Sequence, residues 1–179
     1  SLIASPFYLL ISVVSPKSVA LSFSLLHAVI ISLSLLALFR LMGVEAVLVF
    51  TGFLLFSPIL WFLNKVHTEL LTFCLSTVGL FAVLRGRFVG AMLAFAILAT
   101  QNPSFGLIAV VCGLSWTYSA VRKGPTTREI VGVVIATLLT LLHPLYYWIR
   151  LGVPTPQMAS GAMTMAGFGW KAFFHPFTD

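Results

Sequence analysis

Three polar side chains, Lys65, His67 and Glu69, stand close together between two long apolar stretches. A carboxylate such as Glu69 can act as a base, hold a metal ion or orient a hydroxyl group. Lys65 could hold a phosphate as a point charge, and His67 could bind a phosphate, a metal or a sugar hydroxyl. An acid at the start of a membrane span is costly unless it is paired or functional. Glu69 is therefore the candidate catalytic residue, although a carboxylate also stabilises a helix N-terminus without any chemistry.

A second polar group, Gln101 and Asn102, interrupts a long apolar stretch immediately before Pro103. Proline removes a backbone hydrogen bond, and the residue before it avoids the α region. Broken helices at membrane depth often line binding cavities, so both amides are candidate substrate-binding residues. The alternative is a simple polar turn.

A third group lies near the end of the last long apolar stretch. His143, Tyr147 and Arg150 share one helical face at i, i+4 and i+7, so they could line a cavity together. Arg150 could bind a phosphate through two parallel hydrogen bonds. The structural alternatives are packing of His143 beside Pro144 and extension of Arg150 to the membrane surface. His27, in the middle of an apolar stretch, is expected to be a hydrogen-bonded residue of the bundle.

The composition indicates that most of the chain lies in lipid. Hydrophobic residues make up 60% of the 179 residues and charged residues only 8%, against roughly 25% in soluble domains. The net charge of +6 comes from cations in short loops, and no basic stripe is interleaved with aromatics, so we expect no nucleic-acid partner. Cys74 and Cys112 lack metal-ligand spacing and are expected to be small core residues.

The apolar stretches predict an all-α fold, a polytopic transmembrane bundle of about six spans. We expect a single transmembrane domain over residues 1–179, and both ends suggest an interior fragment of a longer membrane protein. Within it we expect a juxtamembrane or re-entrant segment at 1–16, a helix bundle at 17–150 and an outer-face loop at 151–179. The spans are expected at 17–39, 46–63, 66–84, 88–99, 105–121 and 129–150.

Prolines shape three of these expected elements. Pro58 should bend the far end of the second span, and Pro144 should kink the last one. Residues 88–121 would form a helix of about 50 Å if uninterrupted. Because Pro103 falls in its middle, this stretch is expected to be a helical hairpin of two short spans.

The hairpin sorts the loop cations onto two faces. One face carries four cations and the other carries six: Arg40, Arg85, Arg87, Arg122, Lys123 and Arg128. The positive-inside rule predicts that the six-cation face is cytoplasmic. Glu69, the Gln101–Asn102 turn and Arg150 are then expected together on the outer face.

The order of these elements resembles the GT-C superfamily of membrane glycosyltransferases, in particular bacterial relatives of protein O-mannosyltransferases and aminoarabinose transferases. The resemblance covers nearly the whole chain. It rests on Pro6-Phe7-Tyr8-Leu9-Leu10, Phe56-Ser57-Pro58, His67-Thr68-Glu69, Arg85-Gly86-Arg87 before Ala91 to Gln101, and Tyr146-Tyr147-Trp148-Ile149-Arg150-Leu151-Gly152-Val153-Pro154. Two departures stand out. The catalytic Asp of relatives would precede Ser1, and Gln101 occupies the place of their usual Lys.

The resemblance implies transfer of a sugar from a polyprenyl-phosphate donor to a glycan, lipid or protein acceptor outside the cytoplasm. The upstream Asp would deprotonate the acceptor, and cations such as Lys65 and Arg150 would steady the leaving phosphate. Glu69 would help bind the acceptor or a divalent metal ion, and no nucleotide would be needed. The location implied is the bacterial inner membrane, with the site on its outer face.

Two other classes remain open from the sequence. A transporter segment would suit broken helices and intramembrane histidines, and a structural subunit of a membrane complex would need no chemistry at Glu69 or Lys65. Transporters often contain two related halves, and no internal repeat is evident here. Walker, G-x-S-x-G and H-E-x-x-H motifs are also absent from the sequence.

Overall fold

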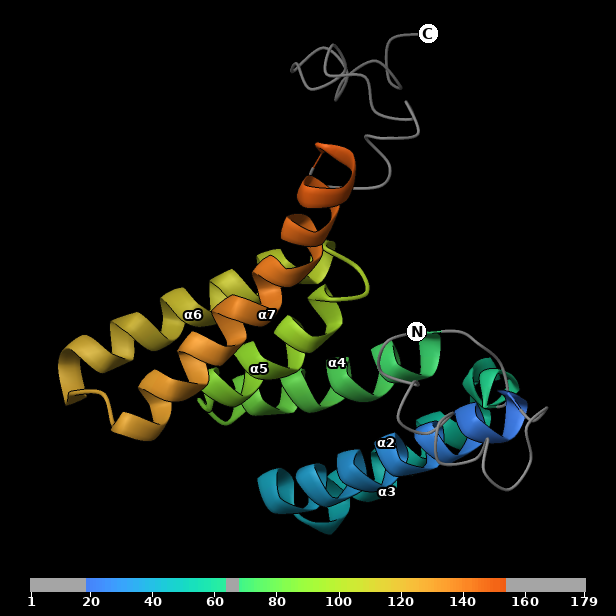
Figure 1. The fold of residues 1–179 in the computed structure, drawn as a ribbon. Helices are drawn as coiled ribbons and strands as arrows, with labels where there is room; N and C mark the ends of the chain where they lie inside the picture. The colour runs from blue at the N-terminus through green and yellow to red at the C-terminus, as the bar shows by residue number, and fades with distance from the viewer. Residues whose placement is uncertain (1–18, 64–67, 154–179) are drawn as a thin grey trace, which may run out of the picture.

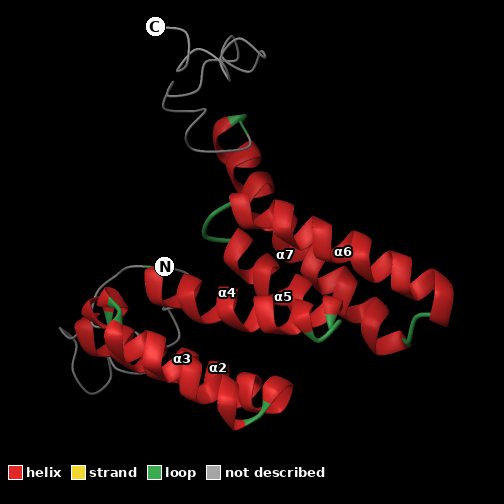
Figure 2. Ribbon diagram, turned by 180° about the vertical axis from the view of Figure 1, so that it is seen from behind, coloured by secondary structure: helices red, strands yellow, loops and turns green. Residues whose placement is uncertain are grey.

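The computed structural model describes residues 19–63 and 68–153, and within them every regular element is a helix (Figures 1 and 2). The predicted all-α fold is therefore confirmed. The predicted segment at 1–16 and most of the loop at 151–179 lie outside the described residues. The elements are α2 (Val19–Met42), α3 (Val44–Phe56), the 3-10 helix η1 (Pro58–Phe62), α4 (Glu69–Leu84), α5 (Phe88–Ala99), α6 (Ser104–Lys123) and α7 (Thr127–Leu151).

Three of the described helices are long and apolar enough to cross a membrane: Leu21–Met42 within α2, α6 and α7. The other three have 13, 16 and 12 residues, which corresponds to roughly 20, 24 and 18 Å against a hydrocarbon core of about 30 Å. The helices of full spanning length are thus fewer than the six spans expected from the sequence. Backbone breaks at Ser57-Pro58 and at residues 100–103 shorten the helices within the apolar runs.

The break at Ser57-Pro58 is sharper than the predicted bend. The α-helix α3 ends at Phe56, and Ser57 is extended with φ −99° and ψ 156°, because the proline ring disfavours the α region for the residue before it. The chain then continues as η1. Ser57 caps the start of η1, since its hydroxyl accepts the backbone N–H of Ile59 over 3.4 Å. The expected span at 46–63 is therefore two separate short helices.

The predicted helical hairpin is confirmed by α5 and α6, which meet at a turn over residues 100–103. Residue Pro103 precedes the first residue of α6, where its missing N–H costs nothing. The rings of Phe95 and Phe105 stack with centroids 6.4 Å apart, which holds the two arms side by side.

Helix α5 is the centre of the described bundle, and α4, α6 and α7 all pack against it. Small side chains make this close packing possible, as in many membrane bundles. A Cβ added at Gly79 of α4 would lie 2.8 Å from Phe95 of α5, and one at Gly132 of α7 would lie 2.6 Å from Val89. The backbones of α4 and α7 can therefore approach α5 only because glycine occupies both positions.

A second layer consists of the α2–α3 hairpin, which packs on α4 (Figures 1 and 2). The core between this hairpin and α4 contains Leu38, Phe50, Leu70 and Cys74, all nearly inaccessible to solvent. Cys112 is buried in the other main cluster, so both free cysteines are core residues, as expected from the sequence.

Helix α7 shows how local sequence defines a helix from end to end. Thr126 and Glu129 form a reciprocal capping box at its start, and Gly152 ends it with a φ of +69°. Pro144 lies inside it, and the ribbon changes direction in its C-terminal half, where α7 rises away from the other helices (Figure 1). The predicted proline kink is therefore present.

Candidate functional site

Glu69 begins α4, and the structure places it at the end of the bundle away from the Arg85–Arg87 bend. Its side chain is half-buried, and the carboxylate oxygen Oε2 is fully covered. A carboxylate in the first turn of a helix is stabilised by the positive end of the helix dipole. Lys65 and His67, the other members of this predicted group, lie outside the described residues.

The Gln101–Asn102 turn lies at the same end of the bundle, since α5 runs antiparallel to α4 with Gly79 packed against Phe95 at mid-length. The backbone N–H groups of Gln101 and Asn102 both donate to the carbonyl oxygen of Leu98, at 2.9 Å each. Glu69 and the two amides thus share one end of the bundle while belonging to different helices.

The two amides of this turn differ in their bonding. Asn102 is exposed, and its Oδ1 accepts the backbone N–H of Ser104 over 3.1 Å, so it caps the start of α6. Gln101 is half-buried and makes only a long contact, 3.4 Å from its Nε2 to the hydroxyl of Thr100. Asn102 therefore has a structural task, and Gln101 is the amide better placed to bind a substrate.

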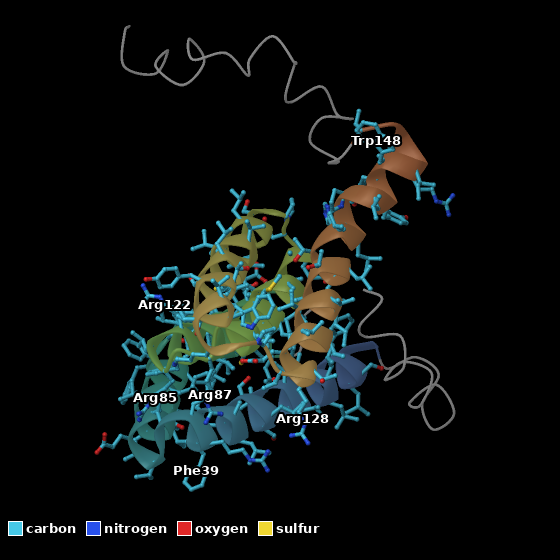
Figure 3. The ribbon with its side chains drawn as sticks, turned by 90° about the vertical axis from the view of Figure 1, so that its left-hand side faces the viewer. Phe39, Arg85, Arg87, Arg122, Arg128 and Trp148 are labelled. Carbon is cyan, nitrogen blue, oxygen red and sulfur yellow. The ribbon has the colours of Figure 1, made fainter. Side chains whose placement is uncertain are left out.

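His143 and Tyr147 are in contact on α7, with ring centroids 4.7 Å apart, as their predicted common face requires. The Nδ1 atom of His143 is buried and has no hydrogen-bond partner among the described residues. Arg150 is exposed near the end of α7, roughly 15 Å along the helix from Thr140, which packs against Gly106 of α6. The structure therefore places His143 in contact with Tyr147, and it places Arg150 in the C-terminal part of α7, which projects from the bundle where Figure 3 labels Trp148.

Comparison with known proteins identifies no relative of this chain. No protein-family model, curated protein or solved structure matches the chain.

The described residues do not themselves form a metal centre. No three His, Cys, Asp or Glu side chains gather within residues 19–63 and 68–153. Mg²⁺ and Ca²⁺ favour several oxygen ligands, and Glu69 is the only described carboxylate at its end of the bundle. Within the described residues, this end of the bundle therefore offers a metal ion a single carboxylate.

The opposite end of the bundle is strongly basic, because the helix ends and turns found there carry the six loop cations. Figure 3 looks onto this end and labels four of its arginines, Arg85, Arg87, Arg122 and Arg128. Two acids, Glu45 and Glu129, are the described carboxylates at this end, against six cations. The cations are Arg40, Arg85, Arg87, Arg122, Lys123 and Arg128.

The structure makes Tyr118 part of a groove at the basic end, which was not predicted from the sequence. The guanidinium carbon of Arg122 lies 4.3 Å from the centre of the Tyr118 ring. Ser115 and Ser119 line the same groove. The spacing of Ser115, Ser119 and Arg122 at i, i+4 and i+7 was a detectable signal, because such residues share one helical face.

Proposed function

We propose that this chain is part of an integral membrane glycosyltransferase that moves a sugar from a polyprenyl-phosphate donor to an acceptor outside the cytoplasm. The observation that supports it is the position of Glu69 and Gln101 at one end of the bundle, away from the basic end. A donor anchored in the membrane by its polyprenyl chain presents its phosphate at the boundary between lipid and water. A site at the end of the helices meets that phosphate without withdrawing the donor from the membrane.

Glu69 would orient the molecule that accepts the sugar. Its carboxylate stands at a helix N-terminus with one oxygen buried, so its direction is restricted. An acceptor hydroxyl would donate a hydrogen bond to it. The acceptor oxygen then bonds to the anomeric carbon, the bond from that carbon to the phosphate oxygen breaks, and the hydroxyl proton passes to the base. The family resemblance implies an aspartate as that base.

The remaining polar residues would act on the donor. Lys65 and Arg150 would balance the charge that develops on the leaving phosphate, and Gln101 would donate hydrogen bonds to it. The short helices α3, α4 and α5 would complete about six membrane-embedded helices around the donor. The basic end would face the cytoplasm, in accordance with the positive-inside rule.

The test measures transfer of labelled sugar from a polyprenyl-phosphate donor in membranes that carry the protein. Glu69→Gln keeps the shape of the side chain and removes its charge, and we expect it to lower the rate at least roughly 100-fold. The matched control is Glu45→Gln, an exposed acid at the basic end, which should keep the wild-type rate.

Two results would overturn the proposal. One is equal transfer by the Glu69→Gln variant and the wild type. The other is uptake of labelled sugar into sealed vesicles without release of polyprenyl phosphate, which would identify a transporter.

A further inference from the structure

An open groove of about 610 Å³ lies on the C-terminal half of α6 beside the first residue of α5, Phe88. Its apolar wall is formed by Leu114 and Phe88, and its polar wall by Ser115 and Ser119. Arg122 and Lys123, in the last turn of α6, line its rim. The groove therefore changes from apolar to cationic along the axis of the helix.

The cationic rim is ordered and open to a ligand. The Arg122 guanidinium packs on the ring of Tyr118, a cation–π contact that restricts its direction. Arg122 and Lys123 are exposed, and the structure shows no carboxylate bonded to either of them within the described residues. The hydroxyl of Ser119 likewise has no side-chain hydrogen-bond partner there. These groups offer donors to an anion and present no acceptor that competes for them.

The groove also has the membrane depth of a lipid headgroup. Helix α6 is long and apolar enough to cross a membrane, and its final turn carries the two cations. Leu114, two turns below Arg122, is 66% exposed, and Val121 beside the rim is 83% exposed. Such exposure suits contact with acyl chains, while the last turn of a span lies at the level of the phosphates.

We propose that this groove binds the headgroup of an anionic phospholipid. Arg122 forms parallel hydrogen bonds with the phosphate, Lys123 contributes a second positive charge, and the Ser119 hydroxyl donates a third contact. One acyl chain lies along Leu114 and Phe88. Charge complementarity selects the occupant, because the leaflet facing a basic protein surface supplies anionic phospholipids at high local concentration.

The experiment titrates phosphatidylglycerol into the purified protein in neutral detergent and follows bound lipid by native mass spectrometry. The double variant Arg122→Gln with Lys123→Gln removes both rim cations. We expect its affinity for phosphatidylglycerol to fall roughly twentyfold. Wild type should bind phosphatidylcholine at least roughly tenfold more weakly than phosphatidylglycerol, because the zwitterionic headgroup has no net charge.

The matched control is Arg40→Gln with Arg128→Gln, which removes two exposed cations from the same end of the bundle but not from the groove. Its affinity should stay within about twofold of wild type, since neither cation lines the groove and both are screened by salt. Equal losses in the two double variants would mean that the lipid responds to the charge of the whole basic end, and this would overturn the groove as a site.

A second variant tests the groove without changing charge. Ser119→Leu fills the polar wall of the groove and keeps both cations, so it should also weaken phosphatidylglycerol binding. Unchanged binding by this variant would overturn the proposal, even if the double variant does not fold. Competition with glycerol phosphate separates a lipid from a free phosphate ester. A large excess should leave the lipid bound, and full displacement would identify a soluble ligand instead.

Discussion

The imidazole Nδ1 of His27, in the middle of α2, lies 2.6 Å from the carbonyl oxygen of Leu63, just beyond η1. His27 is only 2% exposed, and the Phe23 ring packs beside it with centroids 6.1 Å apart. With Nδ1 protonated, the imidazole donates to this carbonyl, which ties the chain after the Pro58 break back to α2. The histidine thus has the hydrogen-bonded bundle role expected from its sequence position.

Replacing this histidine should loosen the α2–α3 hairpin. We expect His27→Leu to lower the free energy of unfolding by about 1 kcal/mol, because the partly buried carbonyl of Leu63 loses its donor. Denaturant unfolding in detergent, followed by circular dichroism, measures this. Ser32→Ala, at an exposed position of the same helix, is the control and should unfold like wild type. A His27→Leu variant as stable as the wild type would show that this hydrogen bond does not stabilise the hairpin.

The close approach of α4 and α5 at Gly79 gives a second prediction. Gly79→Leu would drive a side chain into the Phe95 ring and should destabilise the protein by about 1–3 kcal/mol. The same unfolding assay applies. Gly90→Leu is the matched control, since nothing lies within 4 Å of a Cβ there. Phe95→Ala added to Gly79→Leu should cost less than the sum of the two single changes, because it makes room for the leucine. Strict additivity would argue against this contact.

The cap at the start of α6 gives a third prediction. Asn102→Ala removes the acceptor for the N–H of Ser104 and should cost about 1 kcal/mol of stability, whereas Asn102→Asp keeps the acceptor and should cost less. Thermal unfolding of the two variants measures the difference. A role of Asn102 in substrate binding beyond the cap would appear as lost sugar transfer in the Asn102→Asp variant at unchanged stability.

The orientation of the bundle gives a fourth prediction. Cys74 and Cys112 are buried, so single cysteines can be introduced over a low background. A membrane-impermeant maleimide applied outside intact cells should label Thr68→Cys and should miss Arg87→Cys until the membrane is opened. Both positions are exposed, and they lie at opposite ends of α4 and its following turn. The reverse labelling pattern would put Glu69 on the cytoplasmic side and exclude the proposed reaction there.

Much of the candidate site was predictable because its signals are local. The Asn102–Pro103 pair specified a helix break, and the break places Gln101 at the same end as Glu69 once the chain is a hairpin. The sequence did not predict which of the two amides caps α6, because this depends on which side-chain oxygen lies within hydrogen-bond distance of the N–H of Ser104. Lys65 and His67 lie outside the described residues, so their part in the site stays a prediction.

The sequence by itself determined the helical class, the hairpin of α5 and α6, the Pro144 kink and the collection of six cations at one end. Each follows from apolar length, proline geometry or the alternation of helix direction, all of which act between near neighbours in the chain. Three contacts were decided only by the tertiary structure. Phe95 packs against Gly79, and His27 forms a hydrogen bond with the carbonyl oxygen of Leu63. Ser119 and Arg122 line one groove together with Phe88. These contacts depend on how helices distant in sequence rotate against one another, and that rotation is set by the packing of whole side-chain surfaces.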